Sequence, residues 1–336
     1  MSNPYLNYAS KRLIQAVVVV LLAYVFTFIV VSILPGDPIT NVLRNPQNGF
    51  TEGEIQEIIA AQGLDKPVLV QLSNSFSHFI IGDLGISMRT NRSVSILIAD
   101  VLPSTLILAF TGLVVALLLA ITIAYGTRFL RKEFGQGLLR GFPSLFLSVP
   151  NFVIGLVLIH IFGFQLGLFR VIKPDSFWAT FFAALALGIP ISAQIAEVLI
   201  ANLDHEAGQE YAAVARSRGL SQMQLFAKHL LKPSSLPVVT VIALTIGELL
   251  GGSLITEAVF GRNGVGSLVQ RSVSTQDLPV LQAIVSLAAV VFVVVNLLAD
   301  LAYPLLDPRV KLLGPAERRP VTADDNSAVL SQAVKS

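Results

Sequence analysis

The sequence predicts an all-α membrane protein with six membrane-spanning helices, and three observations support this fold class. Hydrophobic residues make up 54% of the 336 residues and charged residues only 13%, about half the charge of a typical soluble domain. The apolar residues gather in six long segments, and a helix needs about 20 apolar residues to cross a bilayer. The mean hydropathy is +0.73, which excludes a water-soluble globular protein, because so few charges cannot cover so large an apolar core.

The composition also excludes several classes of function. The 23 basic and 21 acidic residues leave a net charge of +2, so no global electrostatic field attracts nucleic acid. The chain contains no cysteine, which removes disulfides, thiol nucleophiles and cysteine-ligated metals. The four histidines lack metal-ligand spacing and no Gly-x-Ser-x-Gly elbow is present. We therefore expect no metal site, no catalytic residues and no enzyme activity in this chain.

Charged residues separate the six predicted spans, which lie within a membrane domain of residues 13–306. The first span ends before Pro35 and Gly36, which interrupt helices. The second carries Pro103 near its start, where a helix tolerates proline. Only the fifth contains an acidic or basic residue, Glu248. The approximate limits of the spans are 13–34, 101–127, 141–169, 176–196, 233–256 and 278–299.

The positions of Lys and Arg predict the orientation of the spans. An even number of spans places both termini on one side, and that side holds 15 of the 23 Lys and Arg residues, against 8 on the other. Cytoplasmic flanks are the ones that retain positive charge. We therefore expect a cytoplasmic N-terminal tail over residues 1–12 and a cytoplasmic C-terminal tail over residues 307–336, with a disordered end.

The outer loop, residues 35–100, is long enough to contain helices of its own. Thr51 and Glu54 have the spacing of a capping box, and Gly63 supplies a helix stop. We expect the apolar faces of this loop to lie on the membrane surface or to cover the helix bundle.

The sequence of the cytoplasmic loop, residues 201–232, predicts two short helices joined by an elbow. Asp204 and Ser221 are expected to cap these helices, and Gly219 between them can adopt a positive φ. Alanines make the first helix thin, so the groove of another protein can approach its backbone, and Tyr211 offers a large anchor. The alternative is an elbow that only joins two spans at the membrane surface.

The run EYAAVARSRGL at residues 210–220 resembles the cytoplasmic signature of ABC transporter permease subunits, in the variant of the dipeptide/oligopeptide (B-type) importer family. The resemblance extends in order and spacing over about residues 8–312. The further motifs that carry it are LPGDP, QGLDKPVLVQ, GDLGISMRTNRSV, LPSTL, TEAVFGRNGVGSLV, DLPVLQAIV and LLADLAYPLLDPRV.

The resemblance implies the type I ABC importer permease fold and the transmembrane subunit of an ATP-driven importer of di- or oligopeptides in the bacterial inner membrane. It implies four partner chains: a homologous second permease that completes a heterodimer, two cytoplasmic ATPase subunits and an extracytoplasmic solute-binding protein. The chain lacks a Gly-rich phosphate loop, so ATP and Mg are expected on the ATPase subunits and no cofactor on this chain. The resemblance assigns ATPase coupling to Glu210, Tyr211, Ala213, Ala215, Arg216 and Gly219.

Two further groups of residues are candidate functional sites. An ionisable residue at membrane depth is costly and is a functional candidate by default, so we predict a substrate pathway lined by Glu248, Gly251 and Gly252. The alternative for Glu248 is a neutral or paired carboxylate that serves packing. At the outer end of the fifth span, a family motif predicts an outer gate or a docking site for the binding protein, formed by Glu257, Gly264 and Gly266.

Two alternative functions remain open from the sequence. The same machinery can import a nickel complex, an opine, glutathione or another small solute, because the binding protein largely sets specificity. A secondary transporter is the more remote alternative. Broken helices and paired intramembrane ions are typical of that class, and the cytoplasmic glycine elbow argues against it.

Overall fold

The computed structural model describes residues 4–33, 51–62, 66–129, 135, 137–275 and 277–306. Within these ranges every regular element is a helix, as the sequence predicts. The predicted C-terminal tail at 307–336 and the helix stop at Gly63 lie outside the described residues. The helices are α1 (Pro4–Ile33), α3 (Glu52–Gln62), α4 (Val68–Ile80), α5 (Val94–Phe129), α6 (Gly137–Ser148), α7 (Asn151–Leu158), η3 (Ile159–Gln165), α8 (Phe177–Ala207), α9 (Glu210–Ser217), α10 (Gln222–Leu225), η4 (Phe226–Leu230), α11 (Leu231–Phe260), α12 (Val265–Ser274) and α13 (Leu278–Leu306).

Five helical segments in the described chain are long and apolar enough to cross a membrane, and the number is six if a bent pair of helices counts as one span. The bent pair takes the place of the third predicted span: α6 meets α7 and η3 at an angle of 101°. Pro150 lies at the bend as the N-cap residue of α7. Proline disfavours the helical conformation of the residue before it, so a single straight helix is interrupted there.

The centre of the bundle is the pair α5 and α8, which share the most extensive contact among the described helices, followed by α8 and α11. Small residues line the α5–α8 contact and let the two backbones approach closely. An added Cβ on Gly188 of α8 would lie 2.8 Å from the backbone oxygen of Gly112 in α5. Both helices also carry fully buried alanines, Ala116 and Ala120 on α5 and Ala183 and Ala184 on α8.

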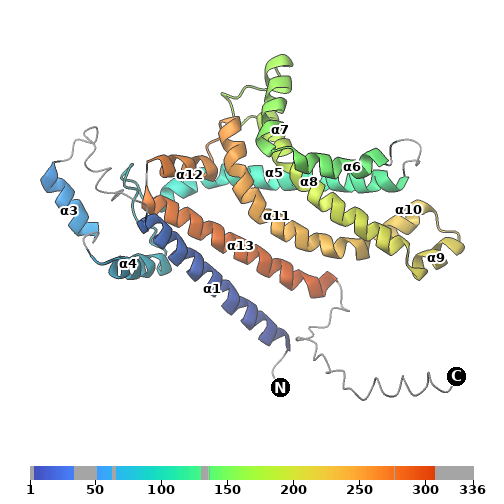
Figure 1. Ribbon diagram of the computed structural model, residues 1–336, viewed down its shortest axis with the longest axis horizontal. Helices are drawn as coiled ribbons and strands as arrows, with labels where there is room; N and C mark the ends of the chain where they lie inside the picture. Colours follow the sequence, from blue (N-terminus) through green and yellow to red (C-terminus); the bar gives the residue numbers. More distant parts are fainter. Residues whose placement is uncertain are drawn as a thin grey trace, which may run out of the picture.

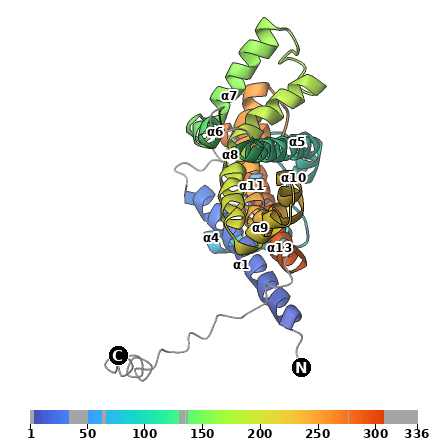
Figure 2. The ribbon, with the colours of Figure 1, turned by 90° about the vertical axis from the view of Figure 1, so that its right-hand side faces the viewer.

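Helices α1 and α13 form a second pair that lies beside this centre (Figure 1, Figure 2). Tyr24 of α1 holds α4 in place, because its hydroxyl lies 2.7 Å from the Ser75 hydroxyl and its ring lies 4.7 Å from the Phe79 ring. Large apolar side chains of α1, including Leu22 and Phe26, are exposed. Such a face is suited to contact with lipid.

The two ends of the molecule carry different elements (Figure 1). The short helices α9 and α10 lie at one end, together with the start of α1 and the end of α13, whereas α3, α4 and α12 lie toward the other. The capping box that begins α3 is confirmed, since the backbone nitrogen of Thr51 donates to Glu54 and the backbone nitrogen of Glu54 donates to the Thr51 hydroxyl. This arrangement agrees with the predicted topology, in which both termini share a side with the loop at 201–232.

Replacing Gly188 by alanine is expected to destabilise the bundle, because the new Cβ meets rigid backbone in α5. Overpacking of this kind costs about 1–3 kcal/mol, which the thermal unfolding of the purified protein in detergent measures. Gly141→Ala is the matched control, since an added Cβ on this α6 residue meets nothing within 4 Å. Equal unfolding temperatures for the two variants would contradict the close α5–α8 contact.

Candidate coupling elbow, pathway and outer polar cluster

The elbow begins where α8 ends, and its first part differs from the sequence prediction. Asp204 was expected to cap a helix, but this is wrong, because α8 continues through Asp204 to Ala207. Its carboxylate instead accepts two hydrogen bonds from Arg140 of α6, at 2.8 and 3.2 Å, and lies 3.5 Å from Arg128 of α5. Asp204 therefore joins the cytoplasmic ends of α5, α6 and α8.

The second part of the elbow agrees with the sequence prediction. Gly219 adopts φ +79°, the left-handed conformation that favours glycine, and an added Cβ there would meet nothing within 4 Å. Ser221 caps α10 in a reciprocal capping box with Gln224: the Ser221 backbone nitrogen donates to the Gln224 side chain at 3.1 Å, and the Gln224 nitrogen donates to the Ser221 hydroxyl at 3.3 Å. The turn is thus fixed locally on both sides of the glycine.

Helix α9 has one face toward the bundle and one face toward solvent. Ala212 and Ala215 are buried in the main hydrophobic core, whereas the Tyr211 and Val214 side chains are 41% and 49% exposed. Of the six predicted coupling residues, five are therefore accessible to another protein, and Ala215 packs inward. The sequence prediction missed Val214, although its spacing of three from Tyr211 places both on one helical face.

One hydrogen bond to a main-chain carbonyl joins the elbow to α8, and a second joins α8 to α5. The Arg216 guanidinium donates to the Ala207 oxygen at 2.6 Å, and Arg128 of α5 donates to the Leu203 oxygen. Both carbonyls belong to the last two turns of α8, close to the end where carbonyls lack intrahelical partners. These two arginines also line a hollow of about 240 Å³ beneath the elbow. The ends of α5, α8 and α9 are therefore joined by directed contacts as well as by apolar packing.

Tyr211 is also held at the junction of α8 and α9. Its hydroxyl donates to the Glu206 carboxylate at 2.5 Å. Partial burial, followed by this hydrogen bond and the nearby negative charge, raises the pKa of Tyr211 to about 12. The phenol therefore stays protonated at physiological pH and remains a hydrogen-bond donor.

The three predicted pathway residues on α11 have different surroundings. Glu248 is exposed, and its carboxylate accepts a hydrogen bond from the Gln194 side chain of α8 at 2.9 Å. A Cβ on Gly251 would meet nothing within 4 Å, whereas a Cβ on Gly252 would lie 3.0 Å from the Leu187 side chain. Glu248 and Gly251 thus share an open face, and Gly252 serves helix packing against α8.

The three predicted outer residues do come together, and they are buried. The Glu257 side chain is fully buried and accepts hydrogen bonds from the Thr105 hydroxyl at 2.6 Å and from the Gly266 and Ser267 backbone nitrogens at 2.8 and 3.3 Å. A Cβ on Gly264 would overlap the Glu257 carboxylate. Glycine is therefore required at 264 for the loop to approach this acid.

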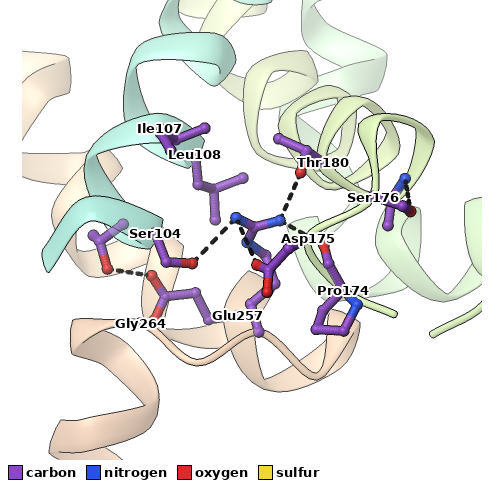
Figure 3. Close-up of polar contacts among 12 residues, drawn as sticks. Ser104, Ile107, Leu108, Pro174, Asp175, Ser176, Thr180, Glu257 and Gly264 are labelled. Atoms are coloured by element: carbon purple, nitrogen blue, oxygen red, sulfur yellow. Dashed lines mark hydrogen bonds and ion pairs between the residues drawn. The ribbon is translucent and has the colours of Figure 1, made fainter. Parts of the chain in front are cut away.

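The sequence prediction missed a second charged residue close to Glu257, Arg262. Its partners Ser104, Pro174, Asp175 and Thr180 are labelled in Figure 3. Its side chain is 3% exposed and donates to the Pro174 oxygen at 2.7 Å, to Thr180 at 2.8 Å and to Ser104 at 3.1 Å. The Asp175 carboxylate lies 3.6 Å from it. The outer polar cluster of Glu257, Arg262 and their partners connects α5, α8, α11 and α12. The sequence contains one signal for this residue: Arg262 follows Glu257 by five positions, just after Gly261, which ends α11.

A bundle of helices of membrane-spanning length, with a helical elbow at one end and a buried polar cluster at the other, defines a multi-span membrane protein. The chain belongs to the family of binding-protein-dependent transport system inner membrane components, whose model matches residues 112–312. The N-terminal model of the same transport systems matches residues 5–109. The resemblance based on the sequence motifs is confirmed. The chain is thus an ABC importer permease of the inner membrane, a transport subunit and not an enzyme.

Curated relatives and a solved structure agree with this assignment. The chain is 32% identical over 307 residues to the glutathione transport system permease protein GsiC of Salmonella typhimurium strain LT2, covering 91% of this chain and 99% of that protein. The corresponding protein of Escherichia coli K12 is 31% identical with the same coverage. A chain of the inward-facing MetNI methionine ABC transporter has the same fold, with a TM-score of 0.53 and 16% identity over 62% of this chain and 96% of that one.

Replacing Glu257 by leucine is expected to destabilise the outer end of the bundle. The change leaves buried donors on Thr105, Gly266 and Ser267 without an acceptor, and each such loss costs about 1–3 kcal/mol. Thermal unfolding of the purified protein measures the effect. Glu197→Leu is the control, because Glu197 is an exposed acid on α8. A Glu257→Leu variant as stable as this control would show that the outer polar cluster contributes little.

Proposed function

We propose that this chain is one of two homologous permease subunits of an importer for di- or oligopeptides, and that its elbow receives motion from a cytoplasmic ATPase subunit. The observation that carries this proposal is the two-sided α9 helix. Its alanine face is packed into the core, while Tyr211 and Val214 offer an exposed face for a partner. Large side chains on a thin helix suit insertion into a groove.

The coupling follows from how the elbow is attached. Arg216 connects it to the end of α8, while Arg128 connects that end to α5 and Asp204 connects it to α6. A force on α9 therefore moves α5, α6 and α8 together and not the elbow alone. Closure of the ATPase pair, driven by ATP binding, would then shift the permease between inward-open and outward-open states as a rigid-body change.

Other chains of the proposed importer supply the energy for transport. Two ATPase subunits bind ATP and Mg, and an extracytoplasmic binding protein delivers the solute. This chain contains no phosphate-binding Gly-rich loop with a Lys-Ser or Lys-Thr pair, which supports this division of work. The second permease forms a heterodimer with this chain, and the solute passes between the two bundles.

The proposed pathway runs along the face of α11 that carries Glu248 and Gly251, with Gly252 holding this helix against α8. The outer gate is proposed at Glu257, Gly264 and Gly266. Their burial supports a role in opening and closing the outer end over direct docking of the binding protein, since a buried carboxylate is not available to a docked protein.

Glutathione is the second candidate solute. The observation in its favour is the 32% identity over nearly the full length to a permease named for glutathione transport. Mass spectrometry of the ligand that co-purifies with the cognate binding protein separates the candidates. Peptides of mixed sequence support the peptide proposal, glutathione alone supports the second candidate, and a nickel complex or an opine would overturn both.

Gly219→Trp is expected to abolish solute-stimulated ATP hydrolysis in the assembled complex while leaving the chain in the membrane. Gly219 is exposed and an added Cβ meets none of the described atoms within 4 Å, so the added indole places its bulk on the surface where the partner is proposed to dock. Gly219→Ala is the matched control, since both variants carry the strain of a side chain at positive φ, about 1–2 kcal/mol, and only tryptophan adds bulk. ATPase assays in proteoliposomes measure coupling, and full stimulation in the tryptophan variant would overturn the role of the elbow.

A further inference from the structure

The open face of α11 carries a carboxylate near the middle of a membrane-spanning helix. The exposed residues Leu244, Glu248, Gly251 and Ile255 recur at intervals of four, three and four, so they occupy one side of the helix. Glu248 lies about 25 Å from the start of α11 and about 18 Å from its end, at a rise of about 1.5 Å per residue. The face is apolar except at this one acidic side chain.

A carboxylate at this depth is costly against lipid, by about 2.5–3.5 kcal/mol even on insertion scales. Its observed partner offsets little of that cost, because the Gln194 amide is neutral and donates one hydrogen bond of 2.9 Å. Among the described residues, no Lys, Arg or His forms an ion pair with Glu248. The negative group is therefore oriented by α8 but has no counter-charge from the described part of this chain.

The glycines around Glu248 differ in a way that helix packing alone does not explain. A Cβ on Gly247 would lie 2.9 Å from the Phe292 ring of α13, and one on Gly252 would lie 3.0 Å from Leu187 of α8. Both glycines are required for contacts between helices. A Cβ on Gly251 would meet nothing within 4 Å, so this glycine leaves free space one turn from the carboxylate and on the same face.

We propose that Glu248 is a specificity-determining residue that receives a positively charged ammonium group of the solute during transit. Gln194 positions one carboxylate oxygen through its hydrogen bond, and Gly251 leaves room for the solute backbone. This inference rests on the proposed function, in which the solute is a peptide that passes along α11. The chemistry that fits the site is an alkylammonium group, which donates hydrogen bonds to a carboxylate oxygen that Gln194 leaves free.

The test measures uptake of three dipeptides by the complete importer in proteoliposomes: one with a lysine side chain, one with a glutamate side chain and one without a charged side chain. Saturating amounts of the same binding protein are used throughout, so its own selectivity is common to all permease variants. E248Q is expected to lower the ratio of lysine-peptide to glutamate-peptide uptake about tenfold. E248D is expected to retain the preference, because it keeps the negative charge.

Two further variants separate recognition from general damage. E197Q removes an exposed carboxylate of α8 that is hydrogen-bonded to Ser144 at 3.3 Å, and it is expected to leave the uptake ratio unchanged. Q194A keeps the acid but removes its orienting amide, so it is expected to reduce the ratio by less than E248Q does. Basal ATP hydrolysis and co-purification with the second permease are measured for every variant.

Each outcome decides between the assignments. If the wild-type complex takes up none of the peptides, the proposed peptide function is wrong and the inference falls with it. If the wild-type complex transports peptides and E248Q changes the ratio less than twofold, the inference alone is wrong. Loss of the second permease from E248Q would identify an ion pair between subunits and would also overturn solute recognition. The expected shift in ratio with intact assembly supports the inference.

Discussion

The absence of water from the hydrocarbon layer is the constraint on which the rest of the structure depends. Backbone polar groups must be satisfied within the protein, which leaves helices and closed barrels as the spanning structures, and the spans described for this chain are helices. Association of these helices then depends on close packing, because lipid is as apolar as leucine. The contact of Gly188 with the α5 backbone is the direct result. It brings α5 and α8 together as the frame that supports both the cytoplasmic elbow and the outer polar cluster.

The pair α5 and α8 also has polar contacts at both of its ends. At one end, Asp204 and Arg128 connect α8 to α5, and the elbow follows directly from α8. At the other end, Arg262 donates to groups from α5 and α8, while Glu257 accepts from α5 and α12. Helix α8 therefore has directed polar contacts near both of its ends, with Pro190 inside the helix between them.

Sequence alone predicted the helical class, the six apolar segments, the Ser221 cap and the positive φ of Gly219, because these depend on local composition and spacing. It placed Asp204 as a cap, which is wrong, since the partners of this acid come from Arg140 and Arg128, which are far away in the sequence. The bend at Pro150 was missed because hydropathy does not distinguish a straight span from a bent pair. Arg262 was missed because its spacing of five from Glu257 is a weak signal, and its burial depends on acceptors from α5, α8 and the segment before α8, which are far away in the sequence.

Glu248 and Glu257 lie nine residues apart on one helix, α11, and their surroundings differ. Glu257 is fully buried, with three hydrogen-bond donors and a guanidinium nearby, so its carboxylate is used by the fold. Glu248 is exposed, with one neutral donor and free space beside it. A buried carboxylate whose oxygens all accept hydrogen bonds from the protein stabilises the fold. A carboxylate at membrane depth with an oxygen that accepts no hydrogen bond needs water, a partner chain or a transported cation to offset its charge. Under our proposal, the ammonium group of the solute offsets the negative charge of Glu248 only while the solute passes. Solutes with such a group are therefore favoured over solutes without one.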